Sequence, residues 1–388
     1  MRSDQENPQA GGTLARQMPL GHPSTARPVR TPRSLVMAAS ARPPTTQKDT
    51  KDSMSRHRIL VTGGAGYIGS VLCPHLLEQG HALTVYDSFF FGRDTLASIS
   101  DHPELGLIEG DIRDRTAVEA AFAADEFDRV IHLAAVSNDP SSELDADITR
   151  TVNLDGTRNV MELAHAAGVG RFLYASSASV YGLRDEEVVS EDLELEPLTL
   201  YARYKGEGEE ILADLSHDAF ETVAVRSATV CGLSPRLRLD LTVNILTYQA
   251  ICNRQITVFG GTQTRPNVHV ADLVDFYTLL LDAPNVSGEA FNVCCGNATV
   301  SEIAQIVRDE IDPTISIETT PTDDDRSYRL DGRKAEQLLD WKPSRGLVDA
   351  VRDLAAAFDA GEVPEPDSDR YRNVALMSGA LDFWRSAP

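Results

Sequence analysis

The chain has 388 residues, of which 42% are hydrophobic, and a formal net charge of −23 at pH 7. A chain of this length can bury a large core and can hold more than one domain. No apolar run approaches the roughly 20 residues of a membrane span, and so acidic a chain is a poor match for nucleic acid. We therefore expect neither a membrane nor a nucleic acid as its partner.

The five cysteines show neither paired metal-ligand spacing nor a disulfide framework. This usage fits a reducing compartment. We expect a cytoplasmic protein without a bound metal.

The first 56 residues differ from the rest in composition. Residues 1–58 hold ten Lys or Arg against four Asp or Glu, whereas residues 59–388 hold 26 against 55. The stretch is rich in Pro, Ser, Thr and Arg, so it cannot pack a core, and we expect a disordered extension. An organelle transit peptide shares this character and stays open. The prolines oppose an amphipathic helix, which favours an upstream extension with the domain beginning near Met54.

A glycine-rich turn joins the first expected strand to the first expected helix. The apolar run 59–61 leads into glycines at positions 63, 66 and 69, and a helical pattern of apolar residues follows at once. Glycine lets the backbone turn tightly and lie against a pyrophosphate at the helix N-terminus, where N–H groups are unpaired. We predict dinucleotide binding here rather than an ordinary turn. The residues concerned are Gly63, Gly66, Tyr67, Ile68 and Gly69.

The next apolar run, 82–86, ends in Asp87, eighteen residues after Gly69. A carboxylate at this place suits a free ribose 2′-hydroxyl and repels a 2′-phosphate. The sequence therefore predicts NAD rather than NADP as the cofactor.

Two later strand ends are also expected beside the cofactor. Asp111 and Ile112 follow the third strand, where they would flank the adenine. Leu133, Ala134 and Ala135 end the fourth strand, and their small side chains would let the cofactor approach. For the two alanines, tight packing between helix and strand is an equal alternative.

Strands and helices alternate from residue 58 onward. The expected strands are 58–62, 82–86, 105–109, 128–134, 171–176 and 221–226, and helices between them include 114–124, 143–168 and 200–214. This alternation is typical of a parallel sheet with right-handed crossovers and helices on both faces. The fold class is α/β, with a Rossmann-type doubly wound sheet.

After residue 228 turn signals multiply, which indicates a smaller mixed α/β domain that binds substrate at the carboxyl ends of the strands. We expect residues 57–228 to form the dinucleotide-binding domain, with a returning segment near 262–283. Residues 229–261 and 284–388 are assigned to the substrate-binding domain and a C-terminal tail.

Tyr201 and Lys205 lie four residues apart, so they share one face of the helix 200–214. A tyrosine is a poor base at neutral pH. A nearby ammonium group and the positive nicotinamide would lower its pKa and favour the phenolate. The fifth strand leads into a hydroxyl-rich turn, 176–182, that could hydrogen-bond a substrate hydroxyl; a Ser-rich turn capping the backbone is the alternative.

Taken together, these motifs resemble the extended short-chain dehydrogenase/reductase family, specifically its nucleotide-sugar epimerases and dehydratases. The resemblance covers residues 57–345 and rests on five motifs. They are Gly63 to Gly69, Asp111-Ile112, Ser177-Ala-Ser-Val-Tyr-Gly182, Tyr201-x-x-x-Lys205 and Arg265-Pro-Asn-Val-His-Val270.

The resemblance implies roles for individual residues. Tyr201 would take the proton from the sugar 4-hydroxyl, Lys205 would hold the nicotinamide ribose, and Ser177 would hydrogen-bond the 4-oxygen. Asn153 matches a position that supports the cofactor. The implied substrate contacts are Ser177, Asn244, Arg265 and one of Arg326 and Arg329, of which we choose Arg326.

The residues after Ser177 separate the subfamilies. Related dehydratases usually carry Asp-Glu or Glu just after the catalytic Ser/Thr, and UDP-glucuronate decarboxylases tend to carry Glu two places on. Here these positions are Ala178 and Ser179, which cannot act as acid or base at neutral pH. We therefore expect an NAD-dependent 4-epimerase that acts on a nucleotide-diphosphate sugar. The resemblance also implies a homodimer.

Alternatives remain within and outside this function. A related 4,6-dehydratase, or a 4-dehydrogenase or reductase, would use the same first step. A non-catalytic NAD sensor is a distant alternative, since such proteins usually lack the Tyr201/Lys205 pair. The sequence leaves the sugar and the nucleotide open, because Thr229 to Gly232 departs from the Asn-Pro-Thr-Gly of galactose epimerases.

Overall fold

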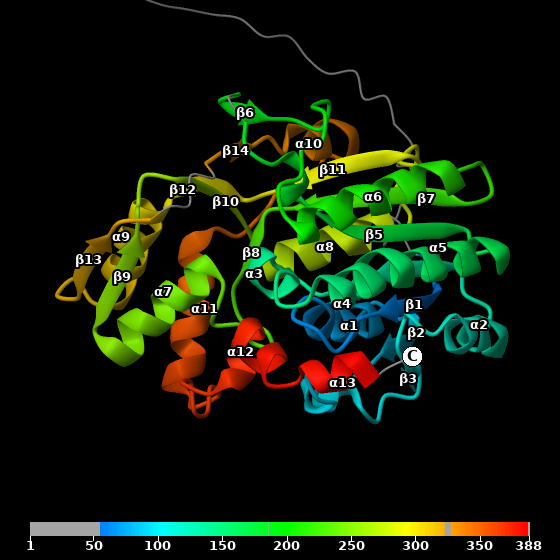
Figure 1. The fold of residues 1–388 in the computed structure, drawn as a ribbon, viewed down its shortest axis with the longest axis horizontal. Coiled ribbons are helices and arrows are strands. Elements are labelled where there is room, and N and C mark those ends of the chain that lie inside the picture. Colours follow the sequence, from blue (N-terminus) through cyan, green and yellow to red (C-terminus); the bar gives the residue numbers. More distant parts are fainter. Residues whose placement is uncertain (1–54, 185, 323–326, 387–388) are drawn as a thin grey trace, which may run out of the picture. The chain divides into compact units, whose positions relative to one another are not determined.

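A computed structural model describes residues 55–184, 186–322 and 327–386. Its main sheet has seven strands in the order β11-β7-β5-β4-β1-β2-β3, and every neighbouring pair is parallel (Figure 1). The strands are β1 (Arg58–Thr62), β2 (Ala82–Asp87), β3 (Leu105–Glu109), β4 (Arg129–His132), β5 (Arg171–Ser177), β7 (Glu221–Ser227) and β11 (Glu289–Val293). The direction of winding reverses between β1 and β4, which is where such sheets bind ligands.

Alternate residues of β1 enter two hydrophobic cores on opposite faces of the sheet. Ile59 and Val61 belong to one core and Leu60 to the other, and all three are at most 1% exposed. This burial on both faces explains why the central strand is a continuous apolar run.

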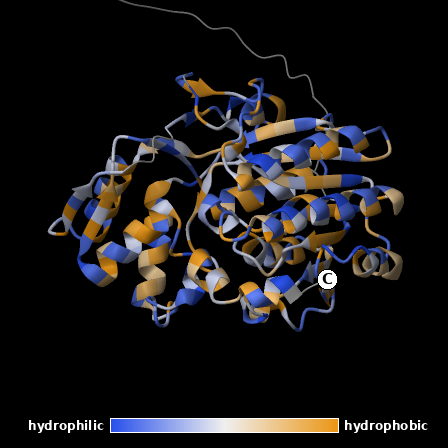
Figure 2. Cartoon of the chain, in the orientation of Figure 1, coloured by the Kyte–Doolittle hydropathy of each residue, from blue (hydrophilic) through white to orange (hydrophobic). Residues whose placement is uncertain are grey.

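Helices fill both cores. α1 (Gly69–Glu78) and α8 (Val270–Leu280) contact each other and contribute to the core of Ile59. The helices α2 (Arg115–Ala124), α5 (Thr157–Ala166) and α6 (Leu200–Leu215) contribute to the core of Leu60. Along these helices hydrophobic and hydrophilic residues alternate, as Figure 2 shows.

A second group of elements follows the main sheet in sequence. The helices α7 (Thr242–Tyr248), α9 (Val300–Ile311) and α11 (Leu347–Asp359) pack together beside the parallel pair β9 (Gln255–Phe259) and β13 (Ser316–Thr320). A three-stranded sheet contains β8 (Thr229–Cys231), β10 (Thr264–His269) and β12 (Gly296–Thr299). The short pair β6 (Val188–Val189) and β14 (Arg329–Leu330) completes the strands of the described residues.

The predicted fold class is confirmed, and all six predicted strands are present with ends that shift by at most two residues. The seventh strand, β11, was missed, and it lies in the stretch that we assigned to the substrate-binding domain. The predicted helix 143–168 is divided, since a π-helical turn at Thr151–Gly156 separates α4 (Ala146–Arg150) from α5. Of the predicted N-terminal extension, residues 1–54 lie outside the described part.

The end of the chain returns to the first half of the main sheet. We call residues 369–386 the C-terminal strap; it contains α12 (Asn373–Ser378) and α13 (Leu381–Ser386). Its Met377 and Trp384 are buried in the core of Leu60. Arg385 forms an ion pair with Asp145 at 2.9 Å. In Figure 1 the strap is the red segment near β3.

No helix in the described part of the chain is long and apolar enough to span a bilayer. All five cysteines are free thiols. Among the described residues we find no cluster of His, Cys, Asp and Glu that could hold a metal ion.

Candidate active site

The glycine turn after β1 is held by its own backbone. Gly63 has φ +74°, and a Cβ on it would lie 2.6 Å from the backbone N of Ala134. The N–H of Gly66 donates to the carbonyl of Gly63 at 3.1 Å, and that of Ser70 donates to Gly66 at 2.9 Å. Only glycine fits position 63, because both the left-handed conformation and the contact with the end of β4 exclude a side chain.

Asp87 at the end of β2 accepts backbone hydrogen bonds from Ala65 at 2.9 Å and Phe89 at 2.8 Å. Burial raises the pKa of this carboxyl, while the two backbone bonds oppose that rise. Asp87 therefore joins the glycine turn to the loop after β2, beside the cavity.

A cavity of about 480 Å³ lies over the carboxyl ends of the central strands. It brings together most of the residues that the sequence singled out. Those on its wall are Gly63, Gly66, Tyr67, Ile68, Gly69, Asp87, Asp111, Ile112, Leu133, Ala134, Ala135, Ser177, Tyr201, Lys205 and Arg265.

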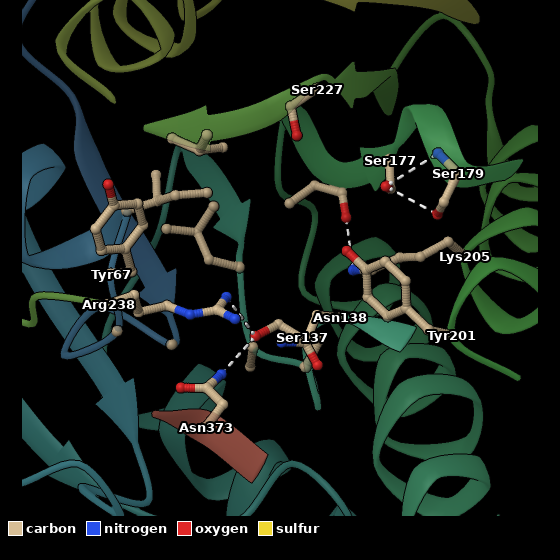
Figure 3. Close-up of a pocket in the computed structure, with 18 of the residues that line it drawn as sticks. Tyr67, Ser137, Asn138, Ser177, Ser179, Tyr201, Lys205, Ser227, Arg238 and Asn373 are labelled. Carbon is tan, nitrogen blue, oxygen red and sulfur yellow. Dashed lines mark hydrogen bonds between the residues drawn. The ribbon is translucent and has the colours of Figure 1, made fainter. Parts of the chain in front are cut away.

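At one end of the cavity Tyr201 and Lys205 project from α6, and Figure 3 shows them side by side. Thr199 caps this helix by accepting a hydrogen bond from Ala202 N at 3.2 Å. The Ser177 Oγ accepts hydrogen bonds from Ser179 Oγ at 2.9 Å and Ser179 N at 3.2 Å. A side-chain hydrogen bond also links Ser177 with Tyr201. The serine, tyrosine and lysine thus line the same cavity, as the resemblance led us to expect.

The electrostatics of Tyr201 differ from our expectation. Burial raises its pKa to about 12, although the hydrogen bond to Ser177 and the charge of Arg238 act in the opposite direction. Burial also lowers the pKa of Lys205 to about 7. The Lys205 Nζ donates to the carbonyl of Ala175 at 2.6 Å and lies 5.8 Å from the centre of the Tyr201 ring. In the protein alone, desolvation dominates the pKa of Tyr201, and the phenol stays neutral at pH 7.

A buried network supports the turn that carries Ser177. Arg226 of β7 binds both carboxylate oxygens of Glu209, at 2.6 Å from Nη2 and 3.0 Å from Nε. Its Nη1 donates to the Tyr181 hydroxyl at 2.8 Å, and Ser176 donates to Glu209. The side chains of Arg226 and Glu209 are only 9% and 11% exposed, so this pair holds the end of β5 against α6.

Comparisons with known proteins identify the family. The model of the NAD dependent epimerase/dehydratase family matches residues 59–294. The chain belongs to this family. NAD is therefore its cofactor, and the site fits it, because the glycine turn leaves the backbone bare along the cavity. Two residues that line the cavity, Arg236 and Trp384, also each have a buried donor, Nε and Nε1, without a hydrogen-bond partner among the described residues.

Relatives within the NAD-dependent epimerase/dehydratase family differ in their named reactions. The chain is 32% identical over 316 residues to UDP-glucuronic acid decarboxylase 1 of Arabidopsis thaliana, covering 78% of this chain and 70% of the relative. It is 30% identical to UDP-glucose 4-epimerase 2 of the same plant, covering 76% and 93%. Among solved structures, DesIV, a dTDP-glucose 4,6-dehydratase of Streptomyces venezuelae with NAD bound, matches with a TM-score of 0.72 and 27% identity, covering 80% and 100%.

Two predicted residues lie behind the cavity wall rather than on it. Asn153 is 1% exposed, and its side chain accepts from Val136 N at 2.7 Å and donates to Val136 O at 2.8 Å. It holds the loop after β4, which agrees with a supporting position. Asn244 is fully buried and binds Gly232 N at 3.0 Å and the Tyr67 hydroxyl at 3.1 Å. Arg326 lies outside the described residues.

The sequence analysis missed a second group of polar residues on the cavity wall. It consists of Ser137, Asn138 and Asp139 after β4, Arg236, Arg238 and Asp240 after β8, and Asn373 and Trp384 of the C-terminal strap. The signal available was Ser234-Pro-Arg-Leu-Arg-Leu-Asp240, in which basic and apolar residues alternate just after a strand. Asn373 and Trp384 gave no local signal, since their position depends on the return of the chain.

Proposed function

We propose that this protein is an NAD-dependent 4-epimerase of a nucleotide-diphosphate sugar. The observation that supports this choice is the composition of the turn beside Tyr201. Ser177 is followed by Ala178 and Ser179, so the turn offers hydroxyl groups to a substrate and no carboxylate. The named relatives, which act on UDP-glucose, UDP-glucuronic acid or dTDP-glucose, support the class of substrate.

In the proposed reaction Tyr201 takes the proton of the sugar 4-hydroxyl while Ser177 hydrogen-bonds the same oxygen. NAD, when bound, supplies the acceptor for the hydrogen on C4 and a positive charge that favours the phenolate. The resulting 4-keto sugar turns over within the cavity. Tyr201 then returns the proton to the oxygen after hydrogen has been restored to the opposite face. Lys205, a buried donor beside Tyr201, orients the ribose of the nicotinamide.

A dehydratase would need an acid and a base close to C5 and C6. Asp139 is the cavity carboxylate whose charge acts on Tyr201, and it accepts a hydrogen bond from Thr199 at 2.6 Å. It stands beside the loop after β4 and not in the turn of Ser177. This residue makes 4,6-dehydration the second candidate, and it is the group that such a reaction would use.

The decisive experiment follows a deuterium label at C4. The protein is incubated with UDP-, GDP- and dTDP-sugars deuterated at C4, and the products are analysed by NMR. We expect two C4 epimers that both keep the label at C4. Transfer of the label to C6 would establish a dehydratase, and release of carbon dioxide from a UDP-uronic acid would establish a decarboxylase; either result rejects the epimerase. The Tyr201→Phe variant serves as the inactive control.

A further inference from the structure

The segment after β8 lies directly against the glycine turn. The Tyr67 hydroxyl donates to the carbonyl of Gly232 at 2.6 Å, and Ser234 Oγ donates to the carbonyl of Tyr67 at 2.7 Å. The N–H of Arg236 donates to Ser70 Oγ at 3.2 Å. Three bonds therefore place Arg236 beside the start of α1, where the diphosphate of a dinucleotide lies in this class of fold.

Arg236 is a buried cation with neutral partners. It is 4% exposed, and its guanidinium lies 4.0 Å from the centre of the Phe91 ring, in the loop that follows Asp87. Its Nη2 donates to Asn373 Oδ1 at 2.7 Å and its Nη1 to the carbonyl of Leu237 at 2.7 Å. The Nε donor has no partner among the described residues and belongs to a residue that lines the cavity. Burial lowers the pKa of Arg236 to about 10.

A second guanidinium stands next to the first. Arg238 is 7% exposed and binds Asp240 through Nε at 2.9 Å and Nη2 at 3.2 Å, while its Nη1 donates to Ser137 Oγ at 3.3 Å. Asp240 also accepts from Asn373 N at 2.8 Å. Of the two buried cations, Arg238 thus has a carboxylate partner in Asp240, whereas Arg236 has none. Burying an uncompensated charge is costly, so this wall of the cavity is built for an anion.

The C-terminal strap joins both guanidiniums to the cofactor cavity. Asn373 accepts from Arg236 and donates through Nδ2 to Ser137 Oγ at 3.1 Å, and Figure 3 shows Asn373, Ser137 and Arg238 linked in this way. Further along, Trp384 packs 4.8 Å from Phe90, and its buried Nε1 has no partner among the described residues. The strap therefore supplies hydrogen bonds to Arg236 and Ser137 through Asn373, and an aromatic contact with Phe90 through Trp384.

We propose that Arg236 and Arg238 bind the diphosphate of NAD beside the glycine turn, and that Asn373 is the positioning residue through which the C-terminal strap retains the cofactor. The diphosphate of a nucleotide sugar has the same chemistry. The glycine turn and Phe91 beside the guanidinium of Arg236 assign this subsite to the dinucleotide. The proposal concerns cofactor retention and holds for any reaction of the family.

The test measures NAD binding directly. Arg236→Met keeps the length of the side chain and removes its charge, and Arg372→Met is the matched control. The Arg372 guanidinium belongs to the same strap but binds the carbonyls of Pro366 and Ser368, and Arg372 does not line the cavity. On protein stripped of cofactor, calorimetry should show a dissociation constant for NAD that rises on the order of tenfold to a hundredfold in R236M and stays unchanged in R372M. The affinity of the wild-type protein for NAD should also fall more steeply with salt concentration than the affinity of R236M.

Three further measurements complete the test, and the first decides which diphosphate this subsite binds. Binding of UDP alone should be unchanged in R236M; weaker UDP binding with normal NAD binding would overturn the proposal. Arg236→Lys should recover part of the NAD affinity that R236M loses, because lysine restores the positive charge but lacks the planar guanidinium with its paired N–H donors. Asn373→Ala keeps both arginines and should speed the release of NAD during gel filtration, so it carries the test if R236M does not fold. Unchanged release in N373A would reject the role of the strap.

Discussion

Replacement of Gly63 by alanine tests the geometry of the glycine turn. At φ +74° a residue with a Cβ loses roughly 1–2 kcal/mol relative to glycine. The new Cβ would also lie 2.6 Å from Ala134 N, 2.8 Å from Ala134 Cα and 2.9 Å from Leu133 C. These are backbone atoms that cannot rotate away, so overpacking adds about 1–3 kcal/mol. We expect the free energy of unfolding to fall by about 2–5 kcal/mol in total.

Gly168 provides the control for this experiment. It has φ +77°, and a Cβ built there meets nothing within 4 Å. Gly168→Ala should therefore show the conformational cost alone, about 1–2 kcal/mol. Urea unfolding followed by circular dichroism gives both values, and calorimetry gives the affinity for NAD. Equal destabilisation of the two variants, or full NAD affinity in G63A, would show that the turn does not press against the end of β4.

Three other predictions concern the site and its supports. Tyr201→Phe should lower kcat by about 10²–10⁴-fold through loss of the base, with unchanged NAD affinity; normal turnover would reject the assigned base. Burial and the charge of Lys205 lower the pKa of His132 to about 3. Its contribution to the free energy of unfolding is therefore full above pH 6.5 and falls by about 1.4 kcal/mol per pH unit as the pH drops from there toward 3. His132→Gln should make the stability depend less on pH in this range, and an unchanged pH dependence would contradict the prediction. Glu209→Leu should cost about 3–5 kcal/mol in urea unfolding by leaving Arg226 unpaired, and a second change, Arg226→Met, should restore much of that loss.

Local sequence patterns were enough to predict most of the residues that line the cavity around the glycine turn and Asp87. The run from β1 through Gly63, Gly66 and Gly69 to α1 is contiguous, and Asp87 ends the neighbouring strand, so strand, turn and helix periodicities locate them. Strand ends of a parallel sheet meet at one edge, which explains why Leu133 and Ser177 also reached the cavity. The cavity residues that we did not predict are brought to the site by contacts between segments that lie far apart in the sequence. Arg236 meets Asn373, 137 residues away.

The sequence did not indicate that the pKa of Tyr201 rises in the protein alone, and the reason is related. Helical spacing correctly places Lys205 on the same face, but spacing says nothing of which acceptor the ammonium chooses or how deeply the phenol is buried. In the structure Lys205 donates to Ala175, and desolvation dominates the pKa of Tyr201. The seventh strand, β11, was missed because five residues with two polar members give a weak period, and its partner β7 fixes it instead.

Tyr201 and the two buried arginines, Arg236 and Arg238, need opposite charges from a ligand, and both proposals depend on this difference. At the Tyr201 end a neutral buried phenol needs positive charge before it can act as a base, since its pKa in the protein alone is about 12. Elsewhere on the cavity wall Arg236 and Arg238 carry more positive charge than Asp240 can balance. A bound dinucleotide would relieve both, because its diphosphate is anionic and its oxidised nicotinamide is cationic. An epimerase returns hydrogen to the sugar it was taken from, so release of the cofactor between the two halves would strand the 4-keto sugar. A strap that slows NAD release would therefore serve the proposed epimerase directly, and N373A should release keto sugar during turnover in proportion to its faster loss of NAD.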